Sequence, residues 1–271
     1  MSAGPGAPAG RNPRAVAVIP ARIASTRLPR KMLLAETGRC LFEHTARSVQ
    51  ESRAFARVVL ATDDAEIAAA AARAGIEARM TRPDHASGTD RVCEAWNQIA
   101  AAGERADVVV NIQGDEPEID PAALASLVAV FADPAIEMAT LAAPLRTEEE
   151  WTSSAVVKLV CDAAGDALYF SRGPIPARGH GVVASGTDPY AGLRRRHIGV
   201  YAFAPAALAR FAALPRGRLE AVESLEQLRW LEAGGKIRVV AAARAPAGID
   251  TREDYERFVT RVRGLERTRS G

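Results

Sequence analysis

Short apolar runs alternate with segments of helical periodicity over the first 150 residues of the chain. A short apolar run at residues 15–20 (AVAVIP) predicts a buried strand, and residues 57–62 (RVVLAT) and 108–113 (VVVNIQ) predict two more strands. Two further strands are predicted at 76–81 and 137–144, and helices at 41–53, 65–74, 89–102 and 121–132. Strands and helices in this alternation predict an α/β fold with a parallel, doubly wound sheet.

The pattern changes after residue 150. Strands are predicted at 156–161, 167–171, 197–204 and 236–242, helices at 205–214, 219–233 and 251–264, and a loop rich in glycine and proline at 173–193. No internal repeat or long linker separates the halves, so we interpret residues 15–264 as one domain. Residues 1–14 lack the apolar core of a secretory signal and predict a disordered tail, and residues 265–271 predict a second, short tail.

Composition excludes several classes of protein. The 271 residues are 48% hydrophobic and 25% charged, which is ordinary for a globular domain. A net charge of +2 argues against a nucleic-acid binder, and no apolar run approaches the 18 residues of a membrane span. The cysteines, Cys40, Cys93 and Cys161, form no CxxC pair, which excludes a zinc knuckle and favours a reducing, cytoplasmic location. Only three of the 35 basic residues are lysines, so a retained lysine indicates a specific need.

The first loop, residues 19–31 (IPARIASTRLPRK), is the richest in candidate chemistry. It follows the first predicted strand, and ligands of doubly wound sheets bind at the carboxyl ends of strands. Its cations and hydroxyls suit a polyanion such as a triphosphate. The cations are Arg22, Arg27, Arg30 and Lys31, and the hydroxyls belong to Ser25 and Thr26. The pattern is not a Walker A loop, and a solvated basic loop in an arginine-rich protein is the alternative.

Three other segments carry candidate ligand groups. Asp115 and Glu116 emerge where the strand in VNIQGDEP ends, which suits Mg²⁺ or, alternatively, a turn and helix cap. Asp250 directly precedes a predicted helix and, taken alone, is an N-cap. Ser87, Gly88 and Thr89 open another helix, where they could bind an anion or simply cap the helix.

Other catalytic patterns are absent from the sequence. The four histidines show no zinc-binding spacing, and no GxSxG elbow exists. The only GxGxxG-like string lies in the N-terminal tail, before the first strand, so a dehydrogenase is disfavoured. Cys93 lies beside Trp96 on a predicted helix, and we interpret it as a core residue rather than a nucleophile.

Taken together, these segments resemble the 3-deoxy-manno-octulosonate cytidylyltransferase family, also called CMP-Kdo synthetases. The resemblance runs in order from about residue 15 to 260 through these strings: VIPARIASTRLPRKML, TRPDHASGTDRV, VVNIQGDEPEI, AVVKLV, ALYFSRGPIP, RHIGVYAF, LEAVESLEQLRWL and GIDTREDYERF. It implies a Rossmann-like nucleotidyltransferase fold and a homodimer. It also implies Mg²⁺-dependent transfer of CMP from CTP to 3-deoxy-D-manno-octulosonate (Kdo) for lipopolysaccharide biosynthesis.

The resemblance assigns roles position by position. The nucleotide-binding positions are Ala21, Arg22, Ser25, Lys31, Arg82, Ser87 and Gly88. The metal-binding positions are Asp115 and Asp250, and Arg22, Lys31, Asp115 and Asp250 are the expected catalytic residues. The sugar-binding positions are Arg27, Gln113, His197, Tyr201, Glu226 and Gln227, with Arg172 a weaker candidate. The segment of residues 155–210 is expected to form the dimer contact and part of the sugar site.

The sequence departs from the family pattern at a few positions. Arg30 stands where the family often has glycine, and Met32 and Cys40 replace prolines. If that glycine needs a positive φ, Arg30 is strained. Three alternatives remain open: the same chemistry on 8-amino-Kdo or in a capsule pathway, a sialic-acid-like substrate (disfavoured by RHIGVYAF), and a non-catalytic nucleotide-binding paralogue.

Overall fold

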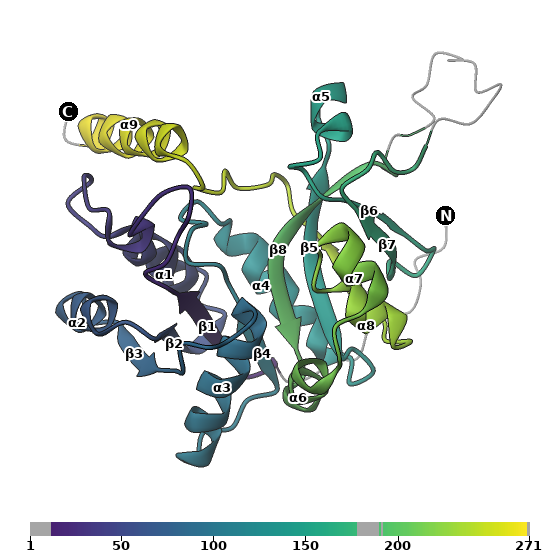
Figure 1. Cartoon of the computed structure of the whole chain (residues 1–271), viewed down its shortest axis with the longest axis horizontal. Coiled ribbons are helices and arrows are strands. Elements are labelled where there is room, and N and C mark those ends of the chain that lie inside the picture. The colour runs from purple at the N-terminus through teal and green to yellow at the C-terminus, as the bar shows by residue number, and fades with distance from the viewer. Residues whose placement is uncertain (1–11, 178–189, 191, 270–271) are drawn as a thin grey trace.

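The computed structural model describes residues 12–177, 190 and 192–269. One sheet has the strand order β3-β2-β1-β4-β8-β5-β9, and β6 and β7 extend it from β8 (Figure 1). The strands are β1 (Ala15–Ala21), β2 (Phe55–Thr62), β3 (Glu77–Met80), β4 (Val108–Asn111), β5 (Met138–Pro144), β6 (Lys158–Cys161), β7 (Ala167–Ser171), β8 (Arg195–Phe203) and β9 (Arg238–Ala241).

The sheet is parallel except where the second half of the chain enters it. β1 pairs in parallel with β2 and β4, and β5 pairs in parallel with β9. β8 lies between β4 and β5 and is antiparallel to both. The predicted mostly parallel α/β sheet is confirmed, but β8 separates two strands of the first half.

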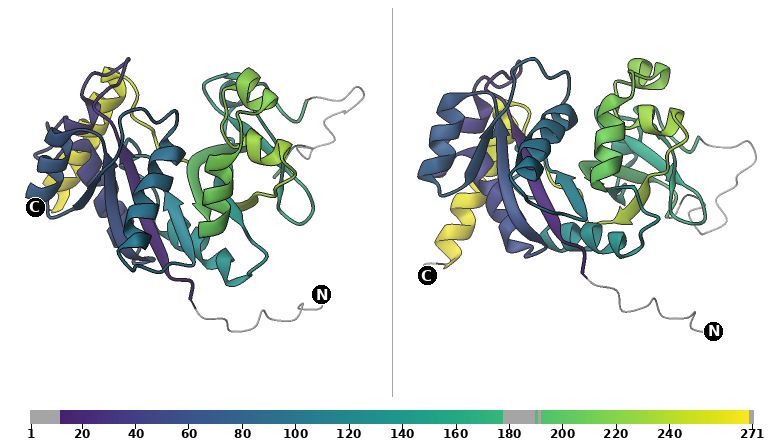
Figure 2. Two further views of the ribbon diagram at one scale, coloured as in Figure 1. Left: turned by 60° about the horizontal axis from the view of Figure 1, so that its bottom comes forward. Right: turned by 90° about the horizontal axis from the view of Figure 1, so that it is seen from below.

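Helices cover both faces of the sheet (Figure 2). The helices are α1 (Leu41–Glu51), α2 (Ala65–Arg73), α3 (Gly88–Ala101), α4 (Pro121–Ala129), α5 (Glu148–Thr152), α6 (Pro205–Ala213), α7 (Arg218–Glu223), α8 (Leu228–Glu232) and α9 (Arg252–Arg269), with 3₁₀ turns η1 (Lys31–Leu33) and η2 (Val130–Ala132). α1, α2 and α4 pack on one face, and α3, α6 and α8 pack on the other.

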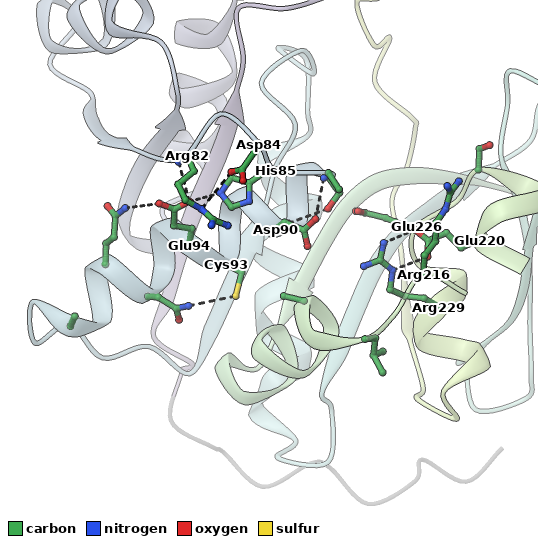
Figure 3. Close-up of a pocket in the computed structure, with 18 residues that line it drawn as sticks. Arg82, Asp84, His85, Asp90, Cys93, Glu94, Arg216, Glu220, Glu226 and Arg229 are labelled. Atoms are coloured by element: carbon green, nitrogen blue, oxygen red, sulfur yellow. Dashed lines mark hydrogen bonds and ion pairs between the residues drawn. The ribbon is translucent and has the colours of Figure 1, made fainter. Parts of the chain in front are cut away.

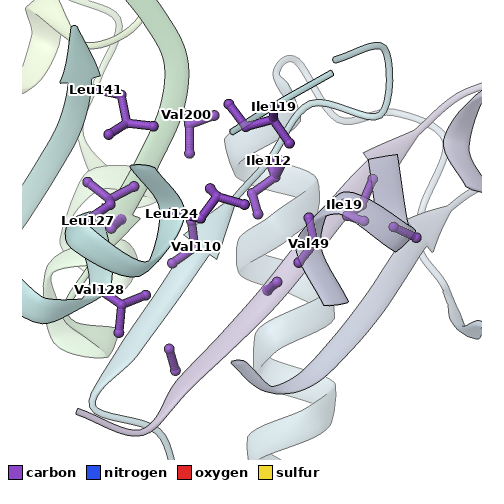
Figure 4. Packing of buried hydrophobic residues seen from close by; sticks show 14 of the residues in the cluster. Ile19, Val49, Val110, Ile112, Ile119, Leu124, Leu127, Val128, Leu141 and Val200 are labelled. Carbon is purple, nitrogen blue, oxygen red and sulfur yellow. The ribbon is translucent and has the colours of Figure 1, made fainter. Parts of the chain in front are cut away.

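The core on the first face joins alternate residues of the central strands to α1 and α4 (Figure 4). Ile19 of β1 and Val110 of β4 are fully buried there with Val49 of α1 and Leu124 of α4. Each such side chain contributes about 1.5–3 kcal/mol relative to exposure. β1 and β4 pair in parallel, Ala15 opposite Val108 through Val18 opposite Asn111, and this register brings their carboxyl ends together.

Local sequence signals start three of the helices. Asp64 caps α2 by accepting from the backbone of Glu66 and Ile67, and the predicted cap at Ser87 is a capping box with Asp90 at the start of α3. Pro121 occupies the first turn of α4, where a proline costs no hydrogen bond.

Besides boundary shifts of a few residues, four features differ from the predictions. The predicted helix at 219–233 is broken into α7 and α8, because Ser224 adopts a left-handed conformation (φ 53°). α5 is a helix that the periodicity does not predict, and α9 continues past residue 264 to Arg269, into the predicted second tail. Arg14, at the end of the predicted N-terminal tail, is instead anchored to Glu104 by a 2.7 Å ion pair.

Most of the predicted N-terminal tail and of the predicted loop at 173–193 lies outside the described residues. The residues that are not described are 1–11 of the tail and 178–189 and 191 of the loop. Among the residues that the structure describes, no helix has both the length and the apolar character needed to span a membrane.

Candidate active site

Segments far apart in the sequence meet at the carboxyl ends of β1 and β4. The loop after β1, the turn after β4, the first turn of α3 and Asp250, two residues before α9, together line a cavity of about 340 Å³. Ten of the predicted site residues line it: Ala21, Arg22, Ser25, Arg27, Lys31, Ser87, Gly88, Gln113, Asp115 and Asp250. The topology therefore gathers the predicted nucleotide and metal positions at one place.

Lys31 is the centre of this cavity. Its Nζ lies 2.5 Å from Asp115 Oδ2 and 3.1 Å from Asp250 Oδ1, and it donates a 2.9 Å hydrogen bond to the carbonyl oxygen of Ile249. Only 7% of Lys31 is exposed. A compact ammonium with three donors satisfies three acceptors here, which explains why an arginine-rich chain keeps a lysine at this position.

Asp250 is not the N-cap of the helix that follows it. Thr251 takes that role, because its Oγ1 accepts from the backbone of Asp254 while Asp254 Oδ2 accepts from the backbone of Thr251 at 2.9 Å. The Asp250 carboxylate instead pairs with Lys31 and, through Oδ2, with Arg27 at 3.0 Å. The N-cap interpretation is therefore wrong, and the Asp250 side chain is directed at the cavity.

The donor set of the cavity fits a divalent cation that is shared with a substrate. Asp115 and Asp250 already bind one cationic group, the Lys31 ammonium, from two sides. No group of three or more His, Cys, Asp or Glu side chains able to hold a metal occurs among the described residues. Mg²⁺ typically takes one or two carboxylates and completes its shell with substrate phosphates and water, so two carboxylates suffice.

Glu116 differs from its neighbour Asp115, although both follow the same strand. Burial, together with the adjacent Asp115 carboxylate, raises the pKa of Glu116 to about 8, so its carboxyl is largely protonated at neutral pH. Its Oε2 has no hydrogen-bond partner in the described part of the chain. The two acidic residues of the motif are therefore not equivalent, and only Asp115 contacts Lys31.

The strain expected at Arg30 is confirmed. Arg30 adopts a left-handed conformation (φ 56°, ψ 26°), which costs a non-glycine residue about 1–2 kcal/mol. Its carbonyl accepts from the backbone of Leu33 at 2.9 Å, and its guanidinium pairs with Glu66 in the first turn of α2. The turn that places Lys31 is thus kept despite the substitution, with Met32 packed beneath Gly114.

Arg82 is the one predicted nucleotide-binding residue outside this cavity. It lines a larger adjoining cavity of about 1230 Å³, between α3 and the segment α6–α8, and Glu226 lies on the opposite side (Figure 3). The two cavities share residues 85–87. Glu94 anchors this loop, because its carboxylate accepts from the backbone of Arg82 at 3.1 Å and also contacts His85.

His197 and Tyr201 of β8 lie behind the two cavities rather than on their surfaces. Thr140 Oγ1 donates to the carbonyl of Val200 at 2.7 Å, so it accepts from His197 Nε2 at 2.9 Å and leaves Nδ1 as an acceptor. Burial lowers the pKa of His197 to about 3, so the imidazole is neutral at pH 7. Tyr201 donates to Gln227 at 2.9 Å, and the tyrosine and His197 rings are 5.4 Å apart.

Arg172, the weaker sugar-site candidate, uses its guanidinium for hydrogen bonds to backbone carbonyls. Its guanidinium donates to the carbonyl oxygens of Glu223 at 2.9 Å and Ser154 at 3.1 Å, and its own backbone N–H donates to the Glu223 carboxylate. These contacts tie β7 to α7.

Two buried polar side chains lie next to the cavity: Thr89, for which the sequence predicts an anion site or a helix cap, and Asn111, to which sequence reasoning assigned no role. Thr89 and Asn111 are fully buried and hydrogen bond to each other at 3.0 Å. The sequence contains a sign that Asn111 matters, because its polar amide side chain ends a strand that is otherwise apolar. A buried polar side chain needs a hydrogen-bond partner, so an asparagine in a buried strand predicts that another polar group of the fold lies within hydrogen-bond distance.

A sheet edge that gathers cations and two carboxylates in one cavity is suited to hold a nucleoside triphosphate, and we place the chain among the nucleotidyltransferases. Comparison with known proteins agrees, since the family model described as Cytidylyltransferase matches residues 16–237. More specifically, the chain belongs to the 3-deoxy-manno-octulosonate cytidylyltransferase family.

The similarity extends over most of the chain. It is 49% identical to the 3-deoxy-manno-octulosonate cytidylyltransferase of Anaeromyxobacter sp. (strain Fw109-5), over 90% of this chain and 95% of that protein. It is 45% identical to the enzyme of the same name from Syntrophotalea carbinolica, over 92% and 98%. Among solved structures, a CMP:2-keto-3-deoxy-manno-octonic acid synthetase complexed with CTP matches with a TM-score of 0.83 and 36% identity, covering 93% of this chain and 99% of the other.

Proposed function

We propose that the chain transfers CMP from CTP to Kdo and releases pyrophosphate, which activates the sugar for lipopolysaccharide synthesis. The observation that carries the proposal is the placement of Lys31 between Asp115 and Asp250 at the base of a cavity rimmed by the basic loop. The names of the relatives and the CTP bound to the similar solved structure support this choice of substrates.

The cations of the cavity have a direct task in such a reaction. Attack of a sugar acid on a triphosphate brings two anions together, so the protein must neutralise charge and fix the in-line geometry. In our proposal, Lys31 and Arg22 bind phosphate oxygens, and the backbone of Gly88 at the N-terminus of α3 adds N–H donors. Arg27, already 3.0 Å from Asp250, is placed to receive the sugar carboxylate.

Asp115 and Asp250 would hold Mg²⁺ once Lys31 turns to the phosphates. When bound there, Mg²⁺ supplies charge neutralisation at the phosphates and makes the sugar hydroxyl more acidic. His197 is not a suitable general base, because burial lowers its pKa to about 3 and its imidazole attracts a proton only weakly. We propose that His197, Tyr201 and Gln227 support the sugar site from behind its surface.

The decisive assay is pyrophosphate release by the purified protein. Reactions contain CTP, Kdo and Mg²⁺, with controls that omit each component and one that replaces CTP by UTP. Release that requires all three components, and is lost with UTP, is the expected result. Release only with another ulosonic acid would keep the chemistry and change the pathway, whereas no release with any acid would refute the proposal in favour of the non-catalytic alternative.

We also propose a homodimer and a cytoplasmic location. Within the segment expected to form the dimer, Leu168 is 61% exposed and Leu193 is 53% exposed, so both side chains are available to a second copy of the chain. The three cysteines are free, as in proteins of a reducing compartment. Light scattering after size-exclusion chromatography should give twice the mass of the chain, and the mass of one chain would contradict the dimer.

A further inference from the structure

A chain of buried hydrogen bonds connects the two cavities. Gln113 Nε2 donates to Asn111 Oδ1 at 3.2 Å, and Asn111 Nδ2 donates to Thr89 Oγ1 at 3.0 Å. Thr89 Oγ1 then donates to Glu226 Oε1 at 2.5 Å. We call this series, Gln113–Asn111–Thr89–Glu226, the relay. It begins in the nucleotide cavity and ends 137 positions further along the chain from Thr89, in the larger cavity.

With Glu226 ionised, the relay has one direction, although burial raises the pKa of this carboxyl. A threonine hydroxyl carries one proton, and here that proton is used toward the Glu226 carboxylate, so the same oxygen can only accept from Asn111. Asn111 must therefore turn its NH₂ group toward Thr89 and its carbonyl oxygen toward Gln113. Gln113 in turn uses its NH₂ group on Asn111, and its Oε1 accepts no hydrogen bond from the described residues.

We propose that Thr89 and Asn111 are positioning residues that hold Gln113 with its carbonyl oxygen available to a hydroxyl group of the sugar acid, and Glu226 with its second carboxylate oxygen turned to the larger cavity. This inference rests on the proposed function, which supplies the sugar acid. Neither residue touches the substrate. Each acts by orienting a side chain that does.

Three features distinguish the relay from ordinary core packing. Both intermediate side chains are 0% exposed, so water cannot replace a missing partner. The two ends of the relay each line a cavity. Gly88 has no side chain between them, and the Gln113 amide lies about 3.7 Å from the position that a Cβ of residue 88 would occupy.

The test replaces the hydroxyl of Thr89 while keeping its shape. Thr89→Val removes the donor to Glu226 and the acceptor for Asn111, and Thr89→Ser restores both. The matched control is Thr62→Val at the end of β2, which is also fully buried and also loses one hydrogen bond, from the backbone of Asp64. Should Thr89→Val not fold, Thr89→Ala, which also lacks the hydroxyl and favours helix, takes its place.

For each variant we would measure KM for Kdo, kcat, the Kd for CTP and the melting temperature. Thr89→Val should raise KM for Kdo about 3–10-fold, the effect of one misplaced hydrogen bond, and change the Kd for CTP less than about twofold. Thr89→Ser should return KM for Kdo to within about twofold of the wild type. Thr62→Val should leave both constants unchanged.

Three results would overturn the inference. These are an unchanged KM for Kdo in Thr89→Val, an equal weakening of CTP binding, or a serine variant that fails to recover. The wild-type reaction separates this failure from that of the proposed function. If the wild type turns over another ulosonic acid, the same constants are measured for that acid, and if it turns over none, the inference falls with the proposed function.

Discussion

Replacing Lys31 by methionine should have opposite effects on turnover and on metal binding. In the substrate-free protein, the Lys31 ammonium occupies the position between Asp115 and Asp250 that a divalent cation would take. Lys31→Met removes this competing cation and leaves two carboxylates facing each other. The variant should therefore bind Mn²⁺, a spectroscopic substitute for Mg²⁺, more tightly than the wild type when CTP is absent.

The size of this effect follows from the distances. At 2.5 and 3.1 Å, each ion pair has a Coulomb energy on the order of 5 kcal/mol for an effective dielectric constant of about 20. Removing the ions from water costs several kcal/mol, and the Asp250 side chain is 46% exposed, which weakens its pair further. We therefore set the net competition at about 1.4 kcal/mol, well below the Coulomb energies, which corresponds to about tenfold tighter Mn²⁺ binding.

Turnover should change in the opposite direction. Loss of one preorganised cation at the phosphates costs on the order of 10²–10³ in kcat. The measurements are Mn²⁺ titration by electron paramagnetic resonance and steady-state pyrophosphate release. The matched control is Lys236→Met, a lysine that is 80% exposed and lies 3.7 Å from Asp166. Mn²⁺ binding that is no tighter in Lys31→Met than in the wild type would refute the competition, and an unchanged kcat would refute the phosphate role.

Three further predictions concern Asp115, His197 and Lys158. Asp115→Asn should nearly abolish pyrophosphate release while CTP binding, measured by calorimetry, partly survives on the basic loop, and a kcat near that of the wild type would contradict the metal assignment. His197 has a pKa of about 3 in the fold against an ordinary 6.5, so the unfolded chain binds its proton first and stability falls as the pH drops below 6.5. Between about pH 7 and 4.5 that loss is about 2–3 kcal/mol, so urea unfolding of His197→Gln should show a correspondingly weaker pH dependence, and an equal slope would contradict the assigned burial. Lys158 is fully buried and donates to three backbone carbonyls, and Lys158→Met should lower the free energy of unfolding by about 3 kcal/mol in urea, whereas a loss below about 1 kcal/mol would show that water replaces the ammonium.

The strands and the nucleotide cavity could be predicted because local signals define them. β1, β2 and β4 are mainly apolar, and the residues that follow β1 and β4 come together when the two strands pair in parallel. The position of β8 could not be predicted, because it depends on pairs of residues that lie 51 to 94 positions apart, and the pattern of a strand does not identify the strand it pairs with.

The break between α7 and α8 shows a second limit of the sequence. Residues 219–233 have helical periodicity, yet Ser224 interrupts the helix with a positive φ. Glu226 and Gln227, which lie just after the break, then reach Thr89 and Tyr201. Buried hydrogen bonds to partners elsewhere in the chain therefore outweigh the local helix propensity of this segment. Such conflicts between local and tertiary preferences are expected at functional sites.

The place of β8 also has a consequence for how the chain is synthesised. β4 and β5 are translated long before β8, and until Arg195–Phe203 leaves the ribosome each presents an unpaired edge. Exposed strand edges are sites of aggregation. Fragments that end near residue 150 should therefore be retained by chaperones or precipitate, and the nascent chain should gain protease resistance abruptly, only once β8 has been inserted between its two neighbours.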